Sequence, residues 1–252
     1  MDISEKVIII TGAARGLGQT YARRFAELGA HLVICDTRSC EETASICRDL
    51  DAEIVAIDTD VTDADSTKAM ADHAVEQFGG IDVLVNNAAL FGSLGFAPFD
   101  KLDEQEWDAT MNVNVKGIWN CCRAVVPHMR HTGGGSIVNI SSLAAIYGMP
   151  NGLHYTTSKA AVIGLTRGLA REVGRFNIRV NAVAPNVVDT EAAGEFFGDK
   201  KEKLMEATTA QMALRKPVEP DDLFGTILYL ASDQSSRTTG QTIMVDGGTV
   251  FL

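Results

Sequence analysis

The first strand–helix–strand segment of the chain constrains the fold more than any other feature. Val7–Ile10 is a continuous apolar run rich in β-branched residues, which predicts a strand buried on both faces. The sequence T-G-A-A-R-G-L-G follows at Thr11–Gly18, and a helical pattern then continues to Leu28. A second apolar run, His31–Cys35, predicts another strand, which Asp36 closes. This order predicts two parallel strands joined by a helix.

The glycine-rich turn of this unit has the pattern of a phosphate-binding loop. Gly12 permits a tight turn, Gly16 lets a pyrophosphate approach the backbone, and Gly18 lets the helix pack on the strand. Free N–H groups at the helix N-terminus would face the phosphates. Asp36, at the end of the next strand, can accept hydrogen bonds from the adenosine ribose and would repel a 2′-phosphate. Arg15 is suited to a 2′-phosphate, but the carboxylate favours NAD; the alternative is a tight turn that binds no ligand.

Apolar strands and amphipathic helices alternate along the whole chain. Further strands are predicted at 53–57, 82–85, 136–140, 179–183 and 241–245, and helices at 62–78, 103–129, 156–173 and 220–230. With no repeat or linker, this order predicts a single α/β domain over residues 1–252. Its expected fold is a Rossmann-like, doubly wound, seven-stranded parallel sheet with helices on both faces. Asn114, in the middle of the long helix, predicts a local distortion or a bound water there.

Tyr155 and Lys159 stand four residues apart at the start of a predicted helix, so their side chains share one helix face. A tyrosine normally titrates near ~10 and is a poor base at neutral pH. A nearby positive charge lowers the pKa of the phenol, which makes Tyr155 a candidate general acid/base for an alcohol proton. Ser142, just after a predicted strand, is placed to hold the oxygen that gains or loses the proton. The alternative is an ordinary Tyr–Lys pair on a solvated helix.

The composition argues against several classes of partner. The 22 Lys and Arg against 33 Asp and Glu give a formal net charge of −11, which argues against nucleic-acid binding. No run approaches the ~20 apolar residues of a membrane helix, and the N-terminus has no signal-peptide pattern, so we expect a cytoplasmic protein without membrane association. The five cysteines show no metal-ligand spacing, and we expect reduced core thiols and no metal site.

The segment around residues 190–216 is charged and irregular, with aromatic and methionine side chains interspersed. Lids are drawn from weakly packed segments, so this segment is predicted to be a mobile cap over the site. Near the other end of the site, Asp60 and Val61 follow the third strand, where a carboxylate could meet the adenine amino group. The apolar tail at residues 249–252 is expected to pack on a neighbouring subunit.

Taken together, these residues resemble the short-chain dehydrogenase/reductase family over essentially the whole chain. The family's T-G-x-x-x-G-x-G corresponds to Thr11–Gly18, its N-N-A-G to Asn86–Ala89, and its P-G to Pro185–Asn186. Its Asn, Ser, Tyr and Lys tetrad falls on Asn114, Ser142, Tyr155 and Lys159. Two departures are Ala89 in place of a glycine and Asn186 in place of the glycine beside the expected nicotinamide.

The resemblance implies a role for each member of the tetrad. Tyr155 is the acid/base on the substrate oxygen, and Lys159 lowers its pKa and holds the nicotinamide ribose. Ser142 positions the oxygen, and Asn114 holds a water in a proton relay. Hydride passes between the substrate carbon and the nicotinamide without a metal. The resemblance also implies a homotetramer, packed through the long helices and the C-terminal region.

The predicted site consists of three overlapping sets of residues. The catalytic set is Asn114, Ser142, Tyr155 and Lys159. The cofactor-binding set is Gly12, Arg15, Gly16, Leu17, Gly18, Asp36, Asp60, Val61, Asn87, Tyr155, Lys159, Val188 and Thr190. The substrate-binding set is Ser142, Leu143, Leu153, Tyr155 and Asn186.

The expected function is NAD-dependent interconversion of a secondary alcohol and a ketone. The mostly apolar pocket candidates favour a cyclic, aromatic or other small hydroxy compound. One alternative is a 3-oxoacyl-carrier-protein reductase, which the lysines of the lid would suit but Asp36 argues against. A sugar or polyol dehydrogenase is a second alternative. A non-catalytic, NAD-sensing binding protein is a third, but it would not need Tyr155 and Lys159 together.

Overall fold

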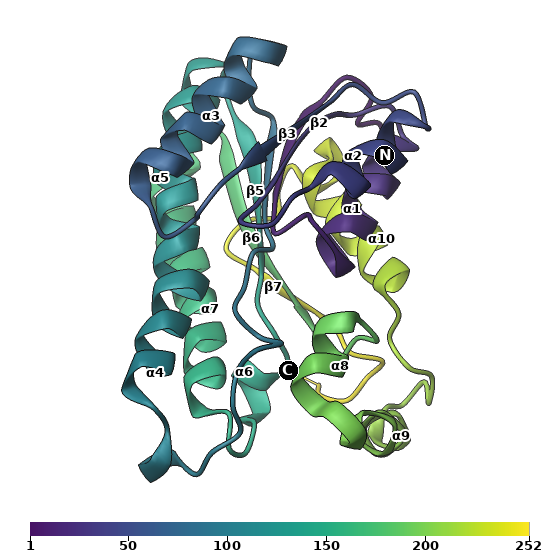
Figure 1. The fold of residues 1–252 in the computed structure, drawn as a ribbon. Coiled ribbons are helices and arrows are strands. Elements are labelled where there is room, and N and C mark those ends of the chain that lie inside the picture. Colours follow the sequence, from purple (N-terminus) through teal and green to yellow (C-terminus); the bar gives the residue numbers. More distant parts are fainter. Residues whose placement is uncertain (252) are drawn as a thin grey trace.

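The computed structural model describes residues 1–251, which fold into a parallel sheet between two layers of helices (Figure 1). The strands are β1 (Val7–Thr11), β2 (His31–Asp36), β3 (Ile54–Asp58), β4 (Val83–Asn86), β5 (Gly135–Ile140), β6 (Ile178–Pro185) and β7 (Thr242–Val245). The helices are α1 (Gly16–Ala26), α2 (Glu41–Arg48), α3 (Ala64–Phe78), α4 (Glu104–Met111), α5 (Gly117–His131), α6 (Ala144–Tyr147), α7 (Leu153–Val173), α8 (Glu191–Phe197), α9 (Lys201–Gln211) and α10 (Pro220–Ala231).

The sheet has the order β3-β2-β1-β4-β5-β6-β7, and every pairing is parallel. The chain builds outward from β1 to β3 and then crosses to the other side of β1 to begin β4. In a doubly wound sheet, ligands bind outside the carboxyl ends of the strands at such a crossing. The predicted fold class and the seven parallel strands are confirmed.

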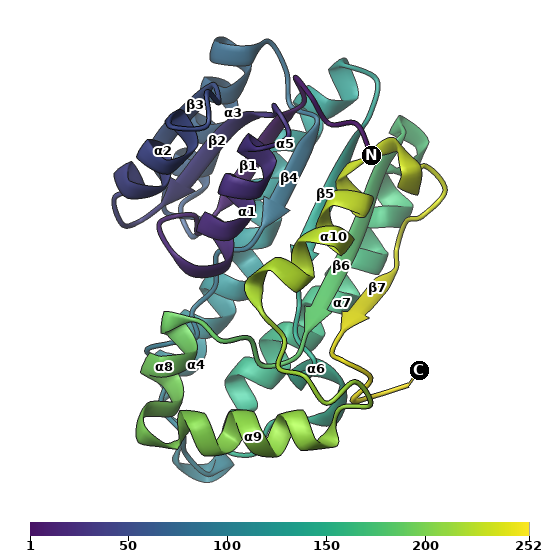
Figure 2. The ribbon, with the colours of Figure 1, turned by 90° about the vertical axis from the view of Figure 1, so that its right-hand side faces the viewer.

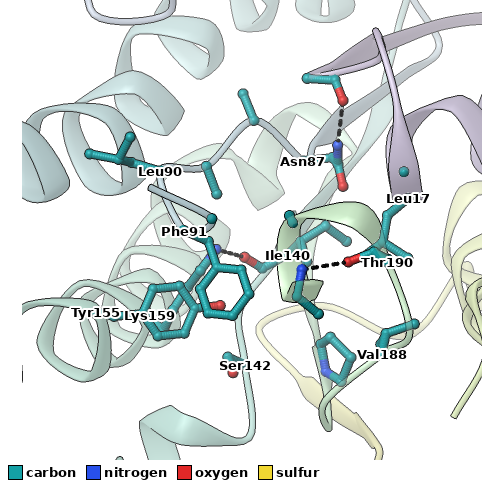
Figure 3. A pocket seen from close by; sticks show the side chains of 18 of the residues that line it. Leu17, Asn87, Leu90, Phe91, Ile140, Ser142, Tyr155, Lys159, Val188 and Thr190 are labelled. Carbon is teal, nitrogen blue, oxygen red and sulfur yellow. Dashed lines mark hydrogen bonds between the residues drawn. The ribbon is translucent and has the colours of Figure 1, made fainter. Parts of the chain in front are cut away.

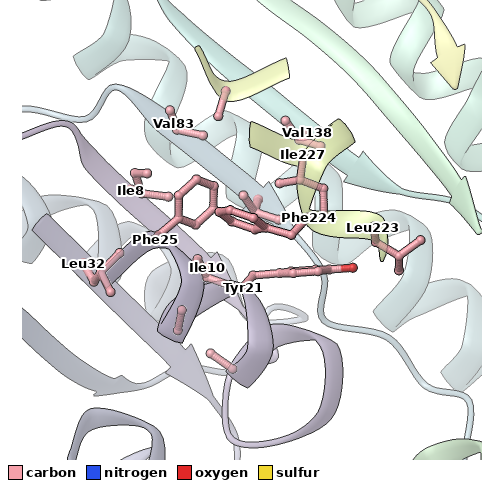
Figure 4. Close-up of a cluster of buried hydrophobic side chains, with 14 of the residues drawn as sticks. Ile8, Ile10, Tyr21, Phe25, Leu32, Val83, Val138, Leu223, Phe224 and Ile227 are labelled. Carbon is pink, nitrogen blue, oxygen red and sulfur yellow. The ribbon is translucent and has the colours of Figure 1, made fainter. Parts of the chain in front are cut away.

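The central strands are buried on both faces because their alternate side chains enter two separate cores. Ile8 and Ile10 of β1 belong to the core under α1 and α10, whereas Ile9 belongs to the core under α3 and α5. Figure 4 shows the first core, where Phe25 and Phe224 pack edge to face with their ring centroids 4.9 Å apart. The continuous apolar strands of the sequence are therefore explained by helices on both faces.

The long helix predicted over 103–129 is two helices, α4 and α5, joined by a π-helical turn at Asn112–Lys116. There the N–H of Gly117 donates to the carbonyl of Asn112, five residues back. The predicted distortion around Asn114 is therefore confirmed. Gly117 is required at this point, because a Cβ there would lie 2.6 Å from a methyl carbon of Val61.

Helices α2, α6 and α7 also differ from the sequence expectation, and the four-residue α6 was not predicted. The short helix α2, after β2, was not predicted, since Glu41–Arg48 has only two turns and few apolar residues. Helix α7 begins at Leu153 rather than residue 156, and it leaves Tyr155 in its first turn. The other predicted strands and helices are present, with ends shifted by one or two residues.

The predicted lid segment forms two short helices, α8 and α9, beyond the carboxyl ends of the strands (Figure 2). Its far end is tied to the C-terminal turn: the N–H groups of Ala213 and Leu214 donate to the carbonyls of Gly248 and Gly247. A Cβ at Gly248 would lie 2.9 Å from that of Ala213, so the two segments touch. The mobility of the lid stays a prediction.

No helix within residues 1–251 is both long and apolar enough to cross a membrane. Over the same residues, no group of three or more His, Cys, Asp or Glu side chains is arranged to hold a metal ion. All five cysteines are buried free thiols, in agreement with the sequence expectation. The C-terminal Leu252 of the predicted apolar tail lies outside the described residues.

Candidate active site

A cavity of about 380 Å³ opens at the carboxyl ends of β1, β2, β4, β5 and β6, with α8 along one side. It is lined by residues from both predicted halves of the site, and Figure 3 shows the part nearest Tyr155. The predicted residues that line it are Gly12, Arg15, Gly16, Leu17, Asp36, Asp60, Val61, Asn87, Ser142, Leu143, Tyr155, Lys159, Asn186, Val188 and Thr190. Gly18, Asn114 and Leu153 are not among the lining residues.

At the glycine-rich turn, the backbone lies in close contact with the loop after β4 and with the start of α1. A Cβ at Gly12 would lie 2.7 Å from Cα of Ala88, and a Cβ at Gly18 would collide with the carbonyl of Gly12. The Asn87 amide ties the two loops together by donating to the carbonyls of Thr11 and Gly12, each at 3.0 Å. Gly18 therefore acts in packing, as predicted.

The start of α1 is open in the way an anion site requires. Helix α1 has no side-chain cap on its first N–H groups and no acidic residue in its first turn. Gly16 has a φ of +59°, and a Cβ there would meet no atom within 4 Å. Backbone donors thus face free space at the positive end of the helix dipole, which suits a pyrophosphate.

At the far end of the cavity, Asp36 closes β2. Its carboxylate accepts from the N–H groups of Ala14 (3.2 Å) and Arg38 (3.1 Å), which fixes its orientation at the cavity wall. Asp60 accepts from the N–H and hydroxyl of Thr62, both at 2.8 Å, so its carboxylate shapes its own turn. Arg38 also lines the cavity. It was not predicted, although its place two residues after the acid at the strand end was the available signal.

The catalytic candidates converge where β5 meets α7. Lys159 is almost fully buried, and its Nζ donates to the carbonyl of Ile140 at 2.9 Å. The same Nζ lies 5.7 Å from the centre of the Tyr155 ring. The Ser142 side chain accepts from the N–H of Ala144 at 3.1 Å, and it lines the same cavity as Tyr155. Figure 3 shows Ser142, Tyr155 and Lys159 grouped at one end of the cavity.

The pKa of Tyr155 is set mainly by burial, which raises it to about 12, and the nearby Ser142 hydroxyl opposes this rise. Burial also lowers the pKa of Lys159 to about 8. Burial is thus the dominant influence on the phenol, and the implied lowering of its pKa by Lys159 stays a prediction. The chain by itself therefore holds Tyr155 as a neutral phenol, a proton donor, at neutral pH.

Asn114 is fully buried behind the cavity wall. Its carbonyl oxygen accepts from the N–H of Leu90 at 2.7 Å, and its amide nitrogen donates to the Leu90 carbonyl and the Ser158 hydroxyl. The side chain thus anchors the loop after β4 to α7, the helix that carries Tyr155. The implied role of Asn114 in holding a water stays a prediction.

Of two further predicted substrate residues, Asn186 lines the cavity and Leu153 does not. The Asn186 amide donates to the hydroxyl of Thr249 at 2.8 Å, and its oxygen accepts from the N–H of Val187. It therefore ties the end of β6 to the C-terminal segment. Leu153 is 41% exposed and lies outside the cavity lining, because the earlier start of α7 turns it outward. Leu143 is buried and lines the cavity as predicted.

An aromatic cluster links the lid to the catalytic tyrosine. The ring of Phe91, from the loop after β4, lies 4.9 Å from that of Tyr155 and 4.3 Å from that of Phe196 on α8. Phe96 and Phe197 complete the cluster, with rings 4.3 Å and 4.9 Å from that of Phe196. Phe91 and Phe197 also line the cavity. Phe197 stands outside the substrate candidates read from the sequence, and its adjacency to Phe196 was the only signal.

Comparisons with known proteins agree with this geometry. Residues 12–250 match the family model described as Enoyl-(Acyl carrier protein) reductase. The chain is 40% identical over 254 residues to the 3-oxoacyl-(acyl-carrier-protein) reductase FabG of Thermotoga maritima, with 100% of both chains covered. Carveol dehydrogenase from Mycobacterium avium, solved in complex with NAD, is 33% identical with a TM-score of 0.90 over 98% of each chain. Levodione reductase is 29% identical with a TM-score of 0.91 over 97% of each chain. With the sheet order, the glycine-rich turn and the Ser142–Tyr155–Lys159 cluster, these matches show that the chain belongs to the short-chain dehydrogenase/reductase family of oxidoreductases.

Proposed function

We propose that this protein is an NAD-dependent dehydrogenase that interconverts a secondary alcohol and a ketone, with an apolar, ring-containing compound as substrate. The observation that carries the proposal is the contact between Phe91 and Tyr155, 4.9 Å between ring centres. It places an aromatic surface directly beside the hydroxyl that would exchange a proton with the substrate. The two ends of the cavity then have separate tasks.

The dinucleotide end is assigned to the glycine-rich turn and Asp36. The open N-terminus of α1 would hold the pyrophosphate, and the Asp36 carboxylate would accept the ribose hydroxyls. Lys159, at the base of the cavity, would donate to the nicotinamide ribose. When bound, the nicotinamide supplies the hydride acceptor or donor. That the carveol dehydrogenase relative was solved with NAD supports the choice of NAD.

At the substrate end, Tyr155 exchanges the proton at the substrate oxygen. In the reduction direction its neutral phenol donates that proton, and Ser142 holds the oxygen by a hydrogen bond. In the oxidation direction the phenolate accepts the proton, and the high pKa of the phenol makes it a strong but rarely ionised base. Leu143 and the lid side chains exclude water from this end.

The aromatic cluster supports a ring-containing substrate. Aromatic side chains favour offset or edge contacts with flat apolar groups, and a small aliphatic or polyol chain would make less contact with the rings of Phe91 and Phe197 that line the cavity. The names of the two structural relatives, carveol dehydrogenase and levodione reductase, describe alicyclic substrates for those proteins. A cyclic alcohol or ketone is therefore the substrate class that this site fits best.

A second candidate is reduction of a 3-oxoacyl group on a carrier protein. It is favoured by the FabG relative at 40% identity over the whole chain and by exposed lysines at the lid, Lys200 and Lys203. A carrier-bound chain would enter past α9, where these cations lie. Asp36 opposes this candidate if the carrier reductase uses a 2′-phosphorylated coenzyme.

The decisive experiment measures NADH formation from NAD across secondary alcohols that are aromatic, alicyclic, aliphatic, polyol or 3-hydroxyacyl thioesters. The control variant is Tyr155→Phe, which should lose roughly a thousandfold or more of the turnover and keep coenzyme binding. A strong signal with alicyclic or aromatic alcohols supports the proposal. Activity only with 3-hydroxyacyl thioesters would replace it with the second candidate, and full activity of Tyr155→Phe would remove Tyr155 as the acid/base.

The homotetramer and the cytoplasmic location expected from the sequence remain predictions.

A further inference from the structure

The guanidinium of Arg15 is held by two carboxylates of the lid. Its Nη1 and Nη2 lie 2.5 Å and 2.7 Å from the two carboxylate oxygens of Glu195, and Nη1 lies 3.3 Å from Oε2 of Glu191. Arg15 belongs to the turn after β1, whereas both glutamates belong to α8, 176 and 180 positions farther along the chain. This forked pair joins the glycine-rich turn to the lid at the cavity.

The position of Glu195 is set by its neighbours. A Cβ at Gly92, in the loop after β4, would lie too close to Oε2 of Glu195, so the glycine leaves room for the carboxylate in its present position. The hydrogen bond from Arg15 lowers the pKa of Glu195 and raises that of Arg15, so both groups are charged at neutral pH. A two-bond guanidinium–carboxylate pair fixes geometry more strongly than a single contact between point charges.

The pair lies on the same cavity as the acid that would contact the ribose. Arg15, Asp36 and Arg38 all line it, and the charge of Arg38 also lowers the pKa of Glu195. Two arginines beside the ribose position would be a ready site for a 2′-phosphate, since guanidinium forks match phosphate oxygens. In this chain, three carboxylates oppose the binding of a phosphate at these arginines: those of Asp36, Glu191 and Glu195.

We propose that Glu195 is a coenzyme-selecting residue of the lid: by holding the Arg15 guanidinium, it withholds that cation from a 2′-phosphate and adds to the rejection of NADP by Asp36. This inference rests on the proposed dinucleotide function and assigns part of its selectivity to the lid. Glu191 makes the longer and weaker contact with Arg15 and acts in the same direction. Selectivity is thus shared between the end of β2 and α8.

The test is direct binding of NADH and NADPH to the full chain, followed by nicotinamide fluorescence without substrate. The variants are Glu195→Gln, Asp36→Ser, the two combined, and Glu195→Gln combined with Arg15→Met. Glu202→Gln, which removes an exposed carboxylate of α9, is the matched control for loss of one charge on the lid. The measured quantity is the ratio of the Kd for NADPH to the Kd for NADH, because a change in lid closure alone shifts both constants together.

Glu195→Gln is expected to lower this ratio by roughly fivefold, and by more in the Asp36→Ser background, where Glu191 is the one remaining carboxylate of the three that oppose a 2′-phosphate. Adding Arg15→Met should abolish this relative gain in NADPH binding, and Glu202→Gln should leave the ratio of the two Kd values unchanged. Thermal melting checks that each variant is folded, and Glu191→Gln gives a smaller change in the same direction if Glu195→Gln does not fold.

Three results would overturn the inference. If NADH binds but the ratio does not move in Glu195→Gln and in the double variant, selectivity does not involve Glu195, and the proposed function stands. If the ratio stays lowered when Arg15→Met is added to Glu195→Gln, the improved NADPH binding is a general charge effect and does not depend on Arg15. If the unmodified chain binds neither coenzyme, the proposed function and the inference both fail.

Discussion

At the scale of single residues, the protonation states of the catalytic cluster are set more by burial than by neighbouring charges. Tyr155 and Lys159 lie one helical turn apart, and the shared face was predicted from that spacing. Removal from water nevertheless raises the pKa of the phenol to about 12 and lowers that of the ammonium to about 8. Both shifts favour the neutral forms, as desolvation always does. The chain itself therefore favours the protonated phenol that ketone reduction requires.

The raised pKa of the phenol predicts different pH dependences for the two directions. Below a pKa of about 12, the phenolate fraction rises tenfold per pH unit, so the kcat/KM for alcohol oxidation should rise between pH 6 and 9. The kcat/KM for ketone reduction should stay nearly flat, because the phenol is protonated throughout this range. Steady-state rates in both directions over the pH series test this. An oxidation rate that is independent of pH would exclude Tyr155 as the titrating base.

Ser142→Ala refines the same prediction. The Ser142 hydroxyl opposes the rise in the pKa of Tyr155, so its removal should leave fewer phenolates at each pH. We expect oxidation to fall by roughly tenfold or more and to keep rising to a higher pH than in the unmodified chain. Ser141→Ala is a neighbouring control, since the Ser141 hydroxyl donates to the Lys159 carbonyl and not to the phenol.

At the scale of elements, α8 is held over the cavity by both charge and aromatic packing. Its Glu195 meets Arg15 of the turn after β1, and its Phe196 meets Phe91 of the loop after β4. Both partners come from loops at the carboxyl ends of the central strands. The lid is thus positioned by the same strand ends that build the cavity, although it follows them by a hundred residues or more in the sequence.

Phe196→Ala tests the aromatic contact. Phe196 is buried against Phe91, Phe96 and Phe197, so truncation removes three ring contacts and opens the substrate end to water. We expect a cyclic substrate to lose about 2 kcal/mol of binding energy, which corresponds to roughly a thirtyfold rise in its KM. The control is Phe99→Ala, whose side chain is 77% exposed. An unchanged KM in Phe196→Ala, with NADH binding also unchanged, would place the substrate elsewhere.

Asn114→Ala tests the anchor at the π-helical turn. The substitution leaves the N–H and carbonyl of Leu90 without their partner, and each unsatisfied buried group costs about 1–3 kcal/mol. The free energy of unfolding, measured with denaturant, should therefore fall by about 2–5 kcal/mol. If Asn114 served only to hold a water, stability would hardly change while activity fell. Chemical denaturation and turnover measured on the same preparation separate these two roles.

At the scale of the whole molecule, the sheet could be predicted from the sequence and much of the site could not. Buried parallel strands such as Val7–Thr11 are local apolar runs, and the glycine turn and Tyr155–Lys159 spacing are local patterns. The contact between Arg15 and Glu195 joins residues 180 positions apart, and no local pattern specifies it. Asn186 illustrates the same limit, because the hydrogen bond between its amide and Thr249 depends on where the C-terminal turn folds back.

The remaining prediction concerns assembly. Trp119 on α5 is 48% exposed, and Phe251 near the C-terminus is 84% exposed, in the two regions through which the homotetramer is expected to pack. Large apolar side chains in such places are stabilised when a neighbouring subunit covers them. Sedimentation velocity should therefore give a mass about four times the 27.0 kDa of the chain.

Phe251→Ser combined with Trp119→Ser should shift the protein to smaller species at low concentration. Leu50→Ser, which removes a 40% exposed side chain between α2 and β3, should not. A monomeric unmodified chain would show that these side chains face water, and that the cavity and its lid are complete within one subunit.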